Sequence, residues 1–176
     1  DGQALEHADD SLKADKNVVT AALQHDDGGV LEHAHDSLKA DRAFVLTAVS
    51  QDWPALEFAS DSLKADKSIV LAAVRQNGRA LRHAHRSLKE DKDVVLAAVL
   101  QDWEALPWAS NELKADKEIA LAAIRQNGGV LCLVDETLRS AKDVVLAAIQ
   151  RDWPAFASAS DKLKEDKDIA LAAVRQ

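Results

Sequence analysis

The sequence of 176 residues contains no methionine and no tyrosine, and it has a single cysteine, Cys132. With one thiol no intrachain disulfide can form, and a lone cysteine fits a reducing compartment. No apolar run approaches the roughly 18 residues that a membrane helix needs. We therefore expect a soluble, intracellular chain with no membrane insertion. Because the chain starts at Asp1 and lacks methionine, we expect it to be a piece of a longer protein.

Basic residues are fewer than acidic ones. Lysine and arginine total 22 residues against 30 aspartates and glutamates, which gives a formal net charge of -8. Nonspecific binding to nucleic acid or to an anionic membrane requires a positive field, so neither is an expected partner. Motifs of catalysis are lacking as well, since no glycine-rich phosphate loop and no nucleophile motif is present. We expect no enzymatic activity and no cofactor.

One phrase, Leu-Lys-Ala-Asp-Lys or a close variant, recurs along the whole chain. The spacing between copies is constant, except that the first step is longer by a single residue. A fixed period of about 25 residues is typical of a stacked repeat protein. The copies begin at Leu12, Leu38, Leu63, Leu88, Leu113, Leu138 and Leu163.

This period divides the chain into seven repeats, numbered one to seven, within a single array over residues 1–176. The extra residue of repeat two falls near Asp26-Asp27, in an expected turn where an insertion costs little. The final helix, at about 167–176, is as apolar as the internal ones, whereas solenoids normally finish with polar caps. We infer a fragment of a longer array, or ends covered by a partner. The repeats are 1–24, 25–50, 51–75, 76–100, 101–125, 126–150 and 151–175.

Each repeat predicts two helices that form a hairpin. In repeat three the first helix is expected at about 53–60, with Asp52 as its cap, and the second at about 67–75, with Asp66 as its N-cap. The apolar run 69–74 predicts a helix covered on more than one side. Its alanine pair and flanking start and stop signals favour helix over a buried strand. The expected fold is an all-α solenoid of about seven 25-residue helical hairpins.

A finer alternation predicts that hairpins pair into a 50-residue super-repeat. Repeats three, five and seven start with Asp-Trp, whereas the others have glycine at that position. Glycine readily takes the left-handed conformation that closes a helix, and tryptophan does not, so two junction geometries are expected. We interpret the tryptophans as core fillers. The residues concerned are Trp53, Trp103 and Trp153, and Gly2, Gly28, Gly78 and Gly128.

Two stretches of repeat three and its neighbour, 63–67 (Leu-Lys-Ala-Asp-Lys) and 75–81 (Arg-Gln-Asn-Gly-Arg-Ala-Leu), resemble a tandem-repeat family classed as a domain of unknown function. The resemblance covers the whole chain and implies no activity, substrate or catalytic residue. Repeat six departs furthest, because Ala141 replaces the capping aspartate. Losing such a cap typically costs about 0.5–2 kcal/mol, unless Ser140 substitutes.

One column of the family pattern holds tyrosine, and here it varies from repeat to repeat. We predict that four of its members, His33, Phe58, His83 and Trp108, form a partner-binding column, because aromatic residues contribute much of the energy of interfaces. The alternative is that these rings pack between successive short helices. The full column is His7, His33, Phe58, His83, Trp108, Leu133 and Ser158.

The histidine pairs His33 and His35, and His83 and His85, do not predict a metal site. Zinc needs ligands that converge on one point. Residues two apart on a helix point in different directions, and equivalent histidines two repeats apart should be roughly 20 Å apart at about 10 Å per helix layer. We therefore expect no metal and assign these side chains a surface or capping role.

Two ladders of basic residues, with one residue of each ladder per repeat, raise the alternative that a polyanion binds along them. Aspartates lie between the two ladders. We expect these aspartates to neutralise the basic charges while the lysine stems cover apolar surface. The first ladder is Lys13, Lys39, Lys64, Lys89, Lys114, Arg139 and Lys164, and the second ladder is Lys16, Arg42, Lys67, Lys92, Lys117, Lys142 and Lys167.

The expected function is that of a non-catalytic scaffold that holds another protein along one face. Two alternatives remain open at this point. The chain is a structural linker within a large multi-protein assembly, or it is the targeting arm of an enzyme whose catalytic domain lies outside it.

Overall fold

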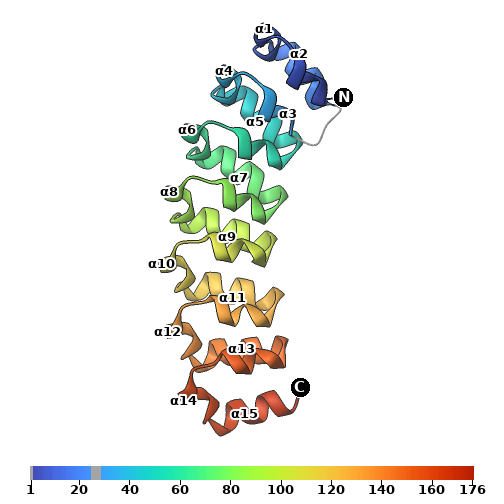
Figure 1. The fold of residues 1–176 in the computed structure, drawn as a ribbon. Helices are drawn as coiled ribbons and strands as arrows, with labels where there is room; N and C mark the ends of the chain where they lie inside the picture. Colours follow the sequence, from blue (N-terminus) through green and yellow to red (C-terminus); the bar gives the residue numbers. More distant parts are fainter. Residues whose placement is uncertain (1, 25–28) are drawn as a thin grey trace. The chain divides into compact units, whose positions relative to one another are not determined.

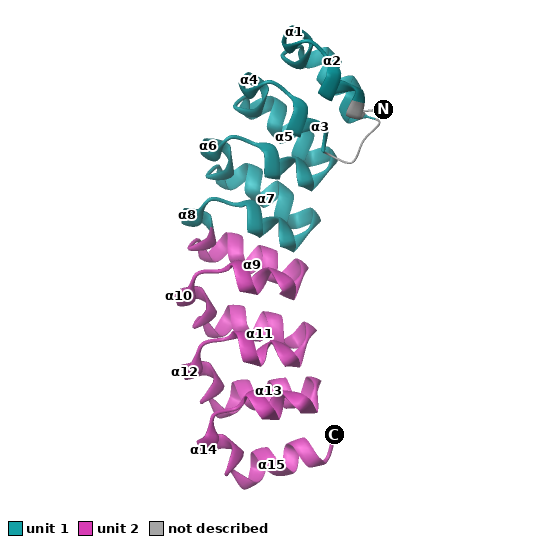
Figure 2. Ribbon diagram, in the orientation of Figure 1, with its two compact units in different colours: residues 1–88 teal, residues 89–176 magenta. Residues whose placement is uncertain are grey.

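A computed structural model describes residues 2–24 and 29–176, the side chains of residues 2 and 3 excepted. The expected insertion near Asp26-Asp27 and the glycine at position 28 lie outside these ranges. The described residues are helical, with no strand among them, which confirms the all-α prediction. None of the helices in these ranges combines the length and the apolar character that crossing a bilayer requires. The chain divides into two compact units, residues 1–88 and 89–176 (Figure 2).

The N-terminal unit contains repeats one to three and about half of repeat four, residues 76–88. Its elements are η1 (Gly2–His7), α1 (Asp10–Lys13), α2 (Lys16–Leu23), α3 (Val30–His33), α4 (Asp36–Lys39), α5 (Arg42–Gln51), η2 (Trp53–Phe58), α6 (Asp61–Lys64), α7 (Lys67–Gln76), η3 (Gly78–His83) and α8 (Arg86–Lys89), where η denotes a 3-10 helix and α8 ends at the unit boundary.

The C-terminal unit repeats the same order of elements. These are α9 (Lys92–Gln101), η4 (Trp103–Trp108), α10 (Asn111–Lys114), α11 (Lys117–Gln126), η5 (Gly128–Leu133), α12 (Glu136–Arg139), α13 (Lys142–Arg151), η6 (Trp153–Ser158), α14 (Asp161–Lys164) and α15 (Lys167–Val174).

A repeat therefore has three elements, as repeat three illustrates. The second predicted helix is confirmed as α7, which starts at Lys67 and ends one residue later than expected. The first predicted helix is instead the six-residue 3-10 helix η2, followed by a separate single turn, α6. Ala59 separates the two with an extended backbone, at φ -63° and ψ 154°. The break has a cause in the neighbouring repeat, because the Ser60 N–H donates to the Lys39 carbonyl at 2.9 Å.

This main-chain hydrogen bond recurs in every pair of successive repeats and sets their register. The residue before each single-turn helix donates its N–H to the last carbonyl of the corresponding helix in the preceding repeat, at 2.9–3.2 Å. Within each unit the single-turn helices consequently lie along one edge, and the longer helices form the layers beside them (Figure 1). The donor–acceptor pairs are His35–Lys13, Ser60–Lys39, His85–Lys64, Ser110–Lys89, Asp135–Lys114 and Ser160–Arg139.

The apolar runs of the long helices make the core, as the sequence predicts. In α7 the side chains of Ile69, Val70, Ala73 and Val74 are fully buried, and the same positions are buried in α9 and α13. The burial of such side chains contributes roughly 25 cal/mol per Å² of apolar surface. The leucine that opens the recurring phrase is buried in most repeats, although Leu12 in repeat one is exposed.

The five junctions that follow α5, α7, α9, α11 and α13 share one backbone geometry, which contradicts the prediction of two. These helices are each followed by an Asp or Asn with an extended backbone: φ and ψ are -148° and 122° at Asp52, and -147° and 116° at Asn77. Gly128 does not adopt the left-handed conformation, and its role is instead to permit close approach. A Cβ atom at this position would lie 2.4 Å from the Ala148 carbonyl oxygen in α13 of the same repeat.

The two hairpins of the super-repeat are distinguished by the side-chain hydrogen bonds at these junctions. Gln76 and Gln126, which open repeats four and six, are the last residues of α7 and α11. Each Nε2 donates to a carbonyl of the preceding long helix, that of Val49 in α5 at 2.6 Å and that of Val99 in α9 at 2.5 Å. The Trp103 N–H donates to the Gln126 side chain at 3.0 Å. The two kinds of hairpin therefore differ in which side chains link them.

The tryptophans are less buried than expected. Trp53 is half-buried, and its ring lies 6.3 Å from that of His83 in the following repeat. Trp103 is also half-buried, but Trp153 is 60% exposed, so the core-filler interpretation is wrong for Trp153. Trp153 belongs to repeat seven, and no ring of the described residues lies against it.

Candidate partner-binding surface

The predicted column occupies one structural position, the last residue of the first helix in its repeat. His33 ends α3, Phe58 ends η2, His83 ends η3 and Trp108 ends η4. An extended residue follows each of them and leads into the single-turn helix at the edge. The repeat thus brings the column residues of each unit to that unit's edge, although their surroundings differ.

His83 is packed against the preceding repeat. Its side chain is 13% exposed, and its Nε2 lies 3.7 Å from a carboxylate oxygen of Glu57. The ring contacts Trp53, and the Arg82 Nε–H donates to the His83 Nε2 at 2.5 Å. His33 and Phe58 are half-buried. For His83 the alternative interpretation, a ring packed between successive repeats, describes the structure better than an exposed anchor does.

Trp108 is the exposed member of the column, with 45% of its surface accessible. The Lys89 Nζ lies 5.8 Å from the centroid of the indole ring, which is cation–π geometry. Burial of the Lys89 side chain lowers the pKa of its ammonium group below its ordinary value. The Lys89 ammonium group is therefore partly shielded from water, and nearly half of the Trp108 surface remains exposed.

Leu133 extends this exposed surface by one repeat, and sequence reasoning missed it. It ends η5, as Trp108 ends η4, and it is 37% exposed. Leu133 is aliphatic and lacks the aromatic ring that the predicted residues share, although its position in the column is visible in the sequence. We call Trp108 and Leu133 the exposed pair.

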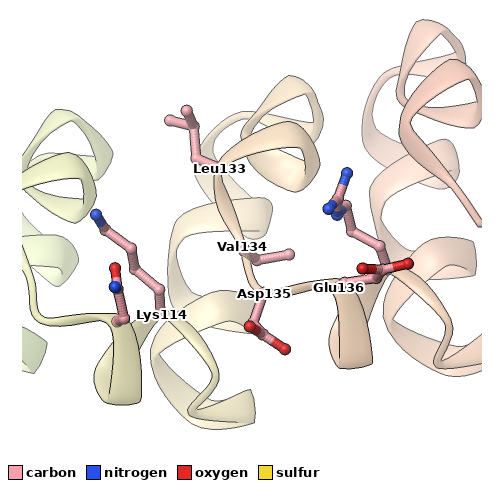
Figure 3. Close-up of a pocket in the computed structure, with 7 residues that line it drawn as sticks. Lys114, Leu133, Val134, Asp135 and Glu136 are labelled. Atoms are coloured by element: carbon pink, nitrogen blue, oxygen red, sulfur yellow. The ribbon is translucent and has the colours of Figure 1, made fainter.

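A groove of about 450 Å³ adjoins Leu133 (Figure 3). In this view the Lys114 and Leu133 side chains point upward, and the Asp135 carboxylate points downward (Figure 3). Asp135 caps α12, because it accepts hydrogen bonds from the Thr137 N–H at 2.9 Å and from the Thr137 hydroxyl at 2.7 Å. The bond from the hydroxyl is the main cause of the lowered pKa of Asp135. The groove is lined by Asn111, Lys114, Leu133, Val134, Asp135, Glu136 and Arg139.

A second groove, of about 230 Å³, lies at the equivalent place one repeat further along the chain. Arg139 takes the position of Lys114, and Ser158 takes that of Leu133. The two grooves share Glu136 and Arg139, so they are neighbours along the edge formed by α10, α12 and α14. The second groove is lined by Glu136, Arg139, Ala157, Ser158, Ala159, Ser160, Asp161 and Lys164.

Two of the histidines cap helices, in agreement with the role assigned to them. The His35 Nδ1 accepts the Ser37 N–H at 3.2 Å at the start of α4. The His85 Nδ1 accepts the Ser87 N–H at 3.3 Å at the start of α8. Over the described ranges, no three His, Cys, Asp or Glu side chains converge as metal ligands would.

The second ladder is neutralised by acids of the following repeat, which weakens the polyanion alternative. Arg42 pairs with Asp66 at 2.7 Å, and the hydrogen bonds from Ser68 and Arg42 lower the pKa of Asp66 to about 2. In repeat six Ala141 provides no cap, as predicted, and Lys117 pairs instead with Asp143. Other pairs of this kind are Lys16–Asp41, Lys92–Asp116 and Lys142–Asp166.

Comparison with known proteins identifies the repeat. The model of the family described as "Domain of unknown function (DUF4116)" matches at residues 25–64, 41–89, 66–114, 91–139 and 142–176. No curated protein and no solved structure matches the chain. The overlapping matches cover most of the sequence and follow one another along its repeats. The chain therefore belongs to the DUF4116 family of tandem repeats.

Proposed function

We propose that this chain is a non-catalytic scaffold that binds another protein along the edge carrying the exposed pair. The observation that supports the proposal best is the exposure of Trp108 (45%) and Leu133 (37%) at equivalent positions of successive repeats. Large apolar side chains on a surface frequently mark interaction sites, and tryptophan is enriched among the residues that dominate binding energy.

The arrangement of the edge favours a protein as the partner over a small molecule. The exposed pair spans two successive repeats, and a groove of about 450 Å³ adjoins it. The main-chain hydrogen bonds from Ser110 to Lys89 and from Asp135 to Lys114 fix the register of these repeats. A rigid edge of this kind offers a partner several contacts at a low cost in conformational entropy.

The test is affinity capture from the native source with the full-length protein and with a double variant, Trp108→Ala with Leu133→Ala. Losing two apolar anchors at an interface should weaken capture roughly 30-fold or more, at about 1–2 kcal/mol or more each. The control is Leu100→Ala, because Leu100 is exposed but lies outside the residues that line the groove.

The two variants give distinguishable results. The proposal predicts that a specific partner is lost with the double variant and kept with Leu100→Ala. Equal capture by the wild type and the double variant, with both folded by circular dichroism, would contradict the proposal.

A further inference from the structure

Departures from the repeat pattern gather at the edge between repeats six and seven. In the first ladder six repeats have lysine, whereas repeat six has Arg139. The column residue that follows it is Ser158, which is far smaller than the aromatic residues of repeats three and five. Both side chains line the 230 Å³ groove. The small side chain of Ser158 leaves space beside the Arg139 guanidinium. At the equivalent place beside Lys89, the Trp108 ring fills this space.

Two polar groups in this groove, the Arg139 Nε and the Ser160 Oγ, are buried and have no hydrogen-bond partner among the described residues. An unpaired buried donor carries a desolvation penalty, so such groups are uncommon in native structures and call for an explanation. Both groups can donate a hydrogen bond. They therefore fit a ligand that presents acceptor oxygens.

The serines at the equivalent position of repeats three and five have hydrogen-bond partners. The Ser60 Oγ is 3.0 Å from the Ser62 Oγ, and the Ser110 Oγ accepts the Leu113 N–H at 3.3 Å. In repeat seven the residue two positions later is Lys162, and Ser160 makes no capping bond with its side chain. The unpaired hydroxyl is thus a property of this groove and not of the repeat.

The charges around the groove select among anions. Arg139 and Lys164 supply two positive charges, and Glu136 and Asp161 supply two negative ones. Lys164 is already 3.5 Å from Asp161, so within the described part of the chain Arg139 is the groove's cation that has no ion pair at contact distance. Its electrostatic partner is the Asp135 carboxylate of the adjoining groove. A planar guanidinium matches the two oxygens of a carboxylate. A phosphate dianion would bring a second negative charge close to Glu136 and Asp161, so a singly charged carboxylate fits better.

We propose that this groove binds a carboxylate side chain from an acidic segment of a protein partner. Arg139 and Ser160 donate hydrogen bonds to its oxygens. The neighbouring groove, which shares Arg139 and contains Leu133, takes an apolar side chain next to the acidic one. This inference rests on the proposed scaffold function and specifies the chemistry of the partner.

The test follows the Arg139 Nε–H resonance of the ¹⁵N-labelled full-length chain during titration with short peptides. The probes are the acetylated and amidated peptide Ala-Ala-Glu-Leu-Ala-Ala and its counterparts with glutamine or phosphoserine in place of glutamate. The glutamate peptide should shift the resonance saturably and bind roughly 10-fold or more tightly than the glutamine peptide, because a charged hydrogen-bonding pair is lost in the latter. Equal binding of the two, or tighter binding of the phosphoserine peptide, would overturn the proposal.

Variants separate a binding role from a structural one. Arg139→Gln and Arg139→Lys should each weaken binding of the glutamate peptide, and Arg139→Lys tests the fork geometry because it keeps the charge. Ser160→Ala should weaken binding without lowering the thermal midpoint, since it removes an unpaired buried group. The matched control, Ser110→Ala, should lower the midpoint and leave binding unchanged, because that hydroxyl caps a helix. Wild-type affinity in both Arg139 variants and in Ser160→Ala would overturn the proposal.

The result is independent of the capture experiment. If capture requires Trp108 and Leu133 but no peptide binds at Arg139, the carboxylate assignment fails and the scaffold function stands. If the glutamate peptide binds at Arg139 but capture does not depend on the exposed pair, the carboxylate site stands and the proposed interface fails.

Discussion

At the scale of single residues, the N-cap of the long helix shows how one position serves both stability and register. Asp66 accepts the Ser68 and Ile69 N–H groups at 2.9 and 3.3 Å and also pairs with Arg42 of the preceding repeat. The cap satisfies donors that the helix leaves unpaired, and the ion pair links neighbouring layers. Ala141 does neither, so repeat six is the weak point of this pattern.

Restoring that cap should stabilise the chain. We expect Ala141→Asp to raise the free energy of unfolding by about 0.5–2 kcal/mol, because it adds the missing capping bonds to α13. Urea denaturation measures the change. Ser140→Asp is the control, since Ser140 is the C-cap of α12 and not the N-cap of α13. Stabilisation by the control alone, or none by Ala141→Asp, would contradict this account of the cap.

Acid should destabilise the chain through the same aspartates. Asp66 has a pKa of about 2, below the 3.8 of an unperturbed aspartate, because of its hydrogen bonds with Ser68 and Arg42. The pKa values of Asp41 and Asp166 are also lowered, mainly by Lys16 and Lys142 respectively. A lowered folded-state pKa contributes stability that is present above about pH 4 and is lost as the pH falls toward 2.

Thermal unfolding at pH 5 and pH 2.5 measures this loss. Asp66→Asn keeps a good capping side chain but cannot ionise, so we expect it to be less stable than the wild type at pH 5 and to lose less stability on acidification. An identical loss in the two proteins would show that Asp66 does not contribute to the pH dependence.

At the scale of elements, the long helices depend on small residues at their closest contacts. Ala72 and Ala73 are adjacent in α7, but Ala73 is fully buried and Ala72 only half-buried. Ala73→Leu should destabilise the chain by about 1–3 kcal/mol, because the added side chain cannot fit a close-packed contact. Ala72→Leu should cost clearly less. Chemical denaturation compares the two, and equal costs would mean that this helix face is misplaced.

Gly128 gives an independent test of how closely η5 approaches α13. Gly128→Ala should destabilise by about 1–3 kcal/mol, since its Cβ would meet backbone atoms, Ala148 O at 2.4 Å and Asp152 N at 3.0 Å. Gly129→Ala is the matched control, because its Cβ would meet only the Asn127 side chain, at 3.1 Å. Similar melting temperatures for Gly128→Ala and the wild type would contradict the close approach.

Sequence reasoning predicted some elements well because their signals are local. The start of α7 at Lys67 follows from the Asp66 cap, and its burial follows from the apolar run. The division between η2 and α6 was not predicted, because it depends on a hydrogen bond from Ser60 to Lys39 in another repeat. Local patterns carry no information about a donor that leaves its own helix for a neighbour.

At the scale of the whole molecule, the constant period of the recurring phrase predicted the repeat architecture, and the variation between repeats pointed to the candidate site only in part. Trp108 was predicted because it is aromatic. Leu133 and Arg139 were not, because a leucine or an arginine in the sequence does not by itself indicate a binding site. Their roles depend on exposure and on a groove shared by two repeats, which only the packed structure defines.

The central claim is that the edge with the exposed pair is the surface that holds a partner. Photo-crosslinking in the native source, with benzoylphenylalanine in place of Leu133 or of Leu100, tests it most directly. Both side chains are exposed, but only Leu133 lines the groove. The account predicts a specific crosslinked protein from position 133 and none, or far less, from position 100. Equal crosslinking from both positions, or crosslinking from position 100 alone, would contradict it.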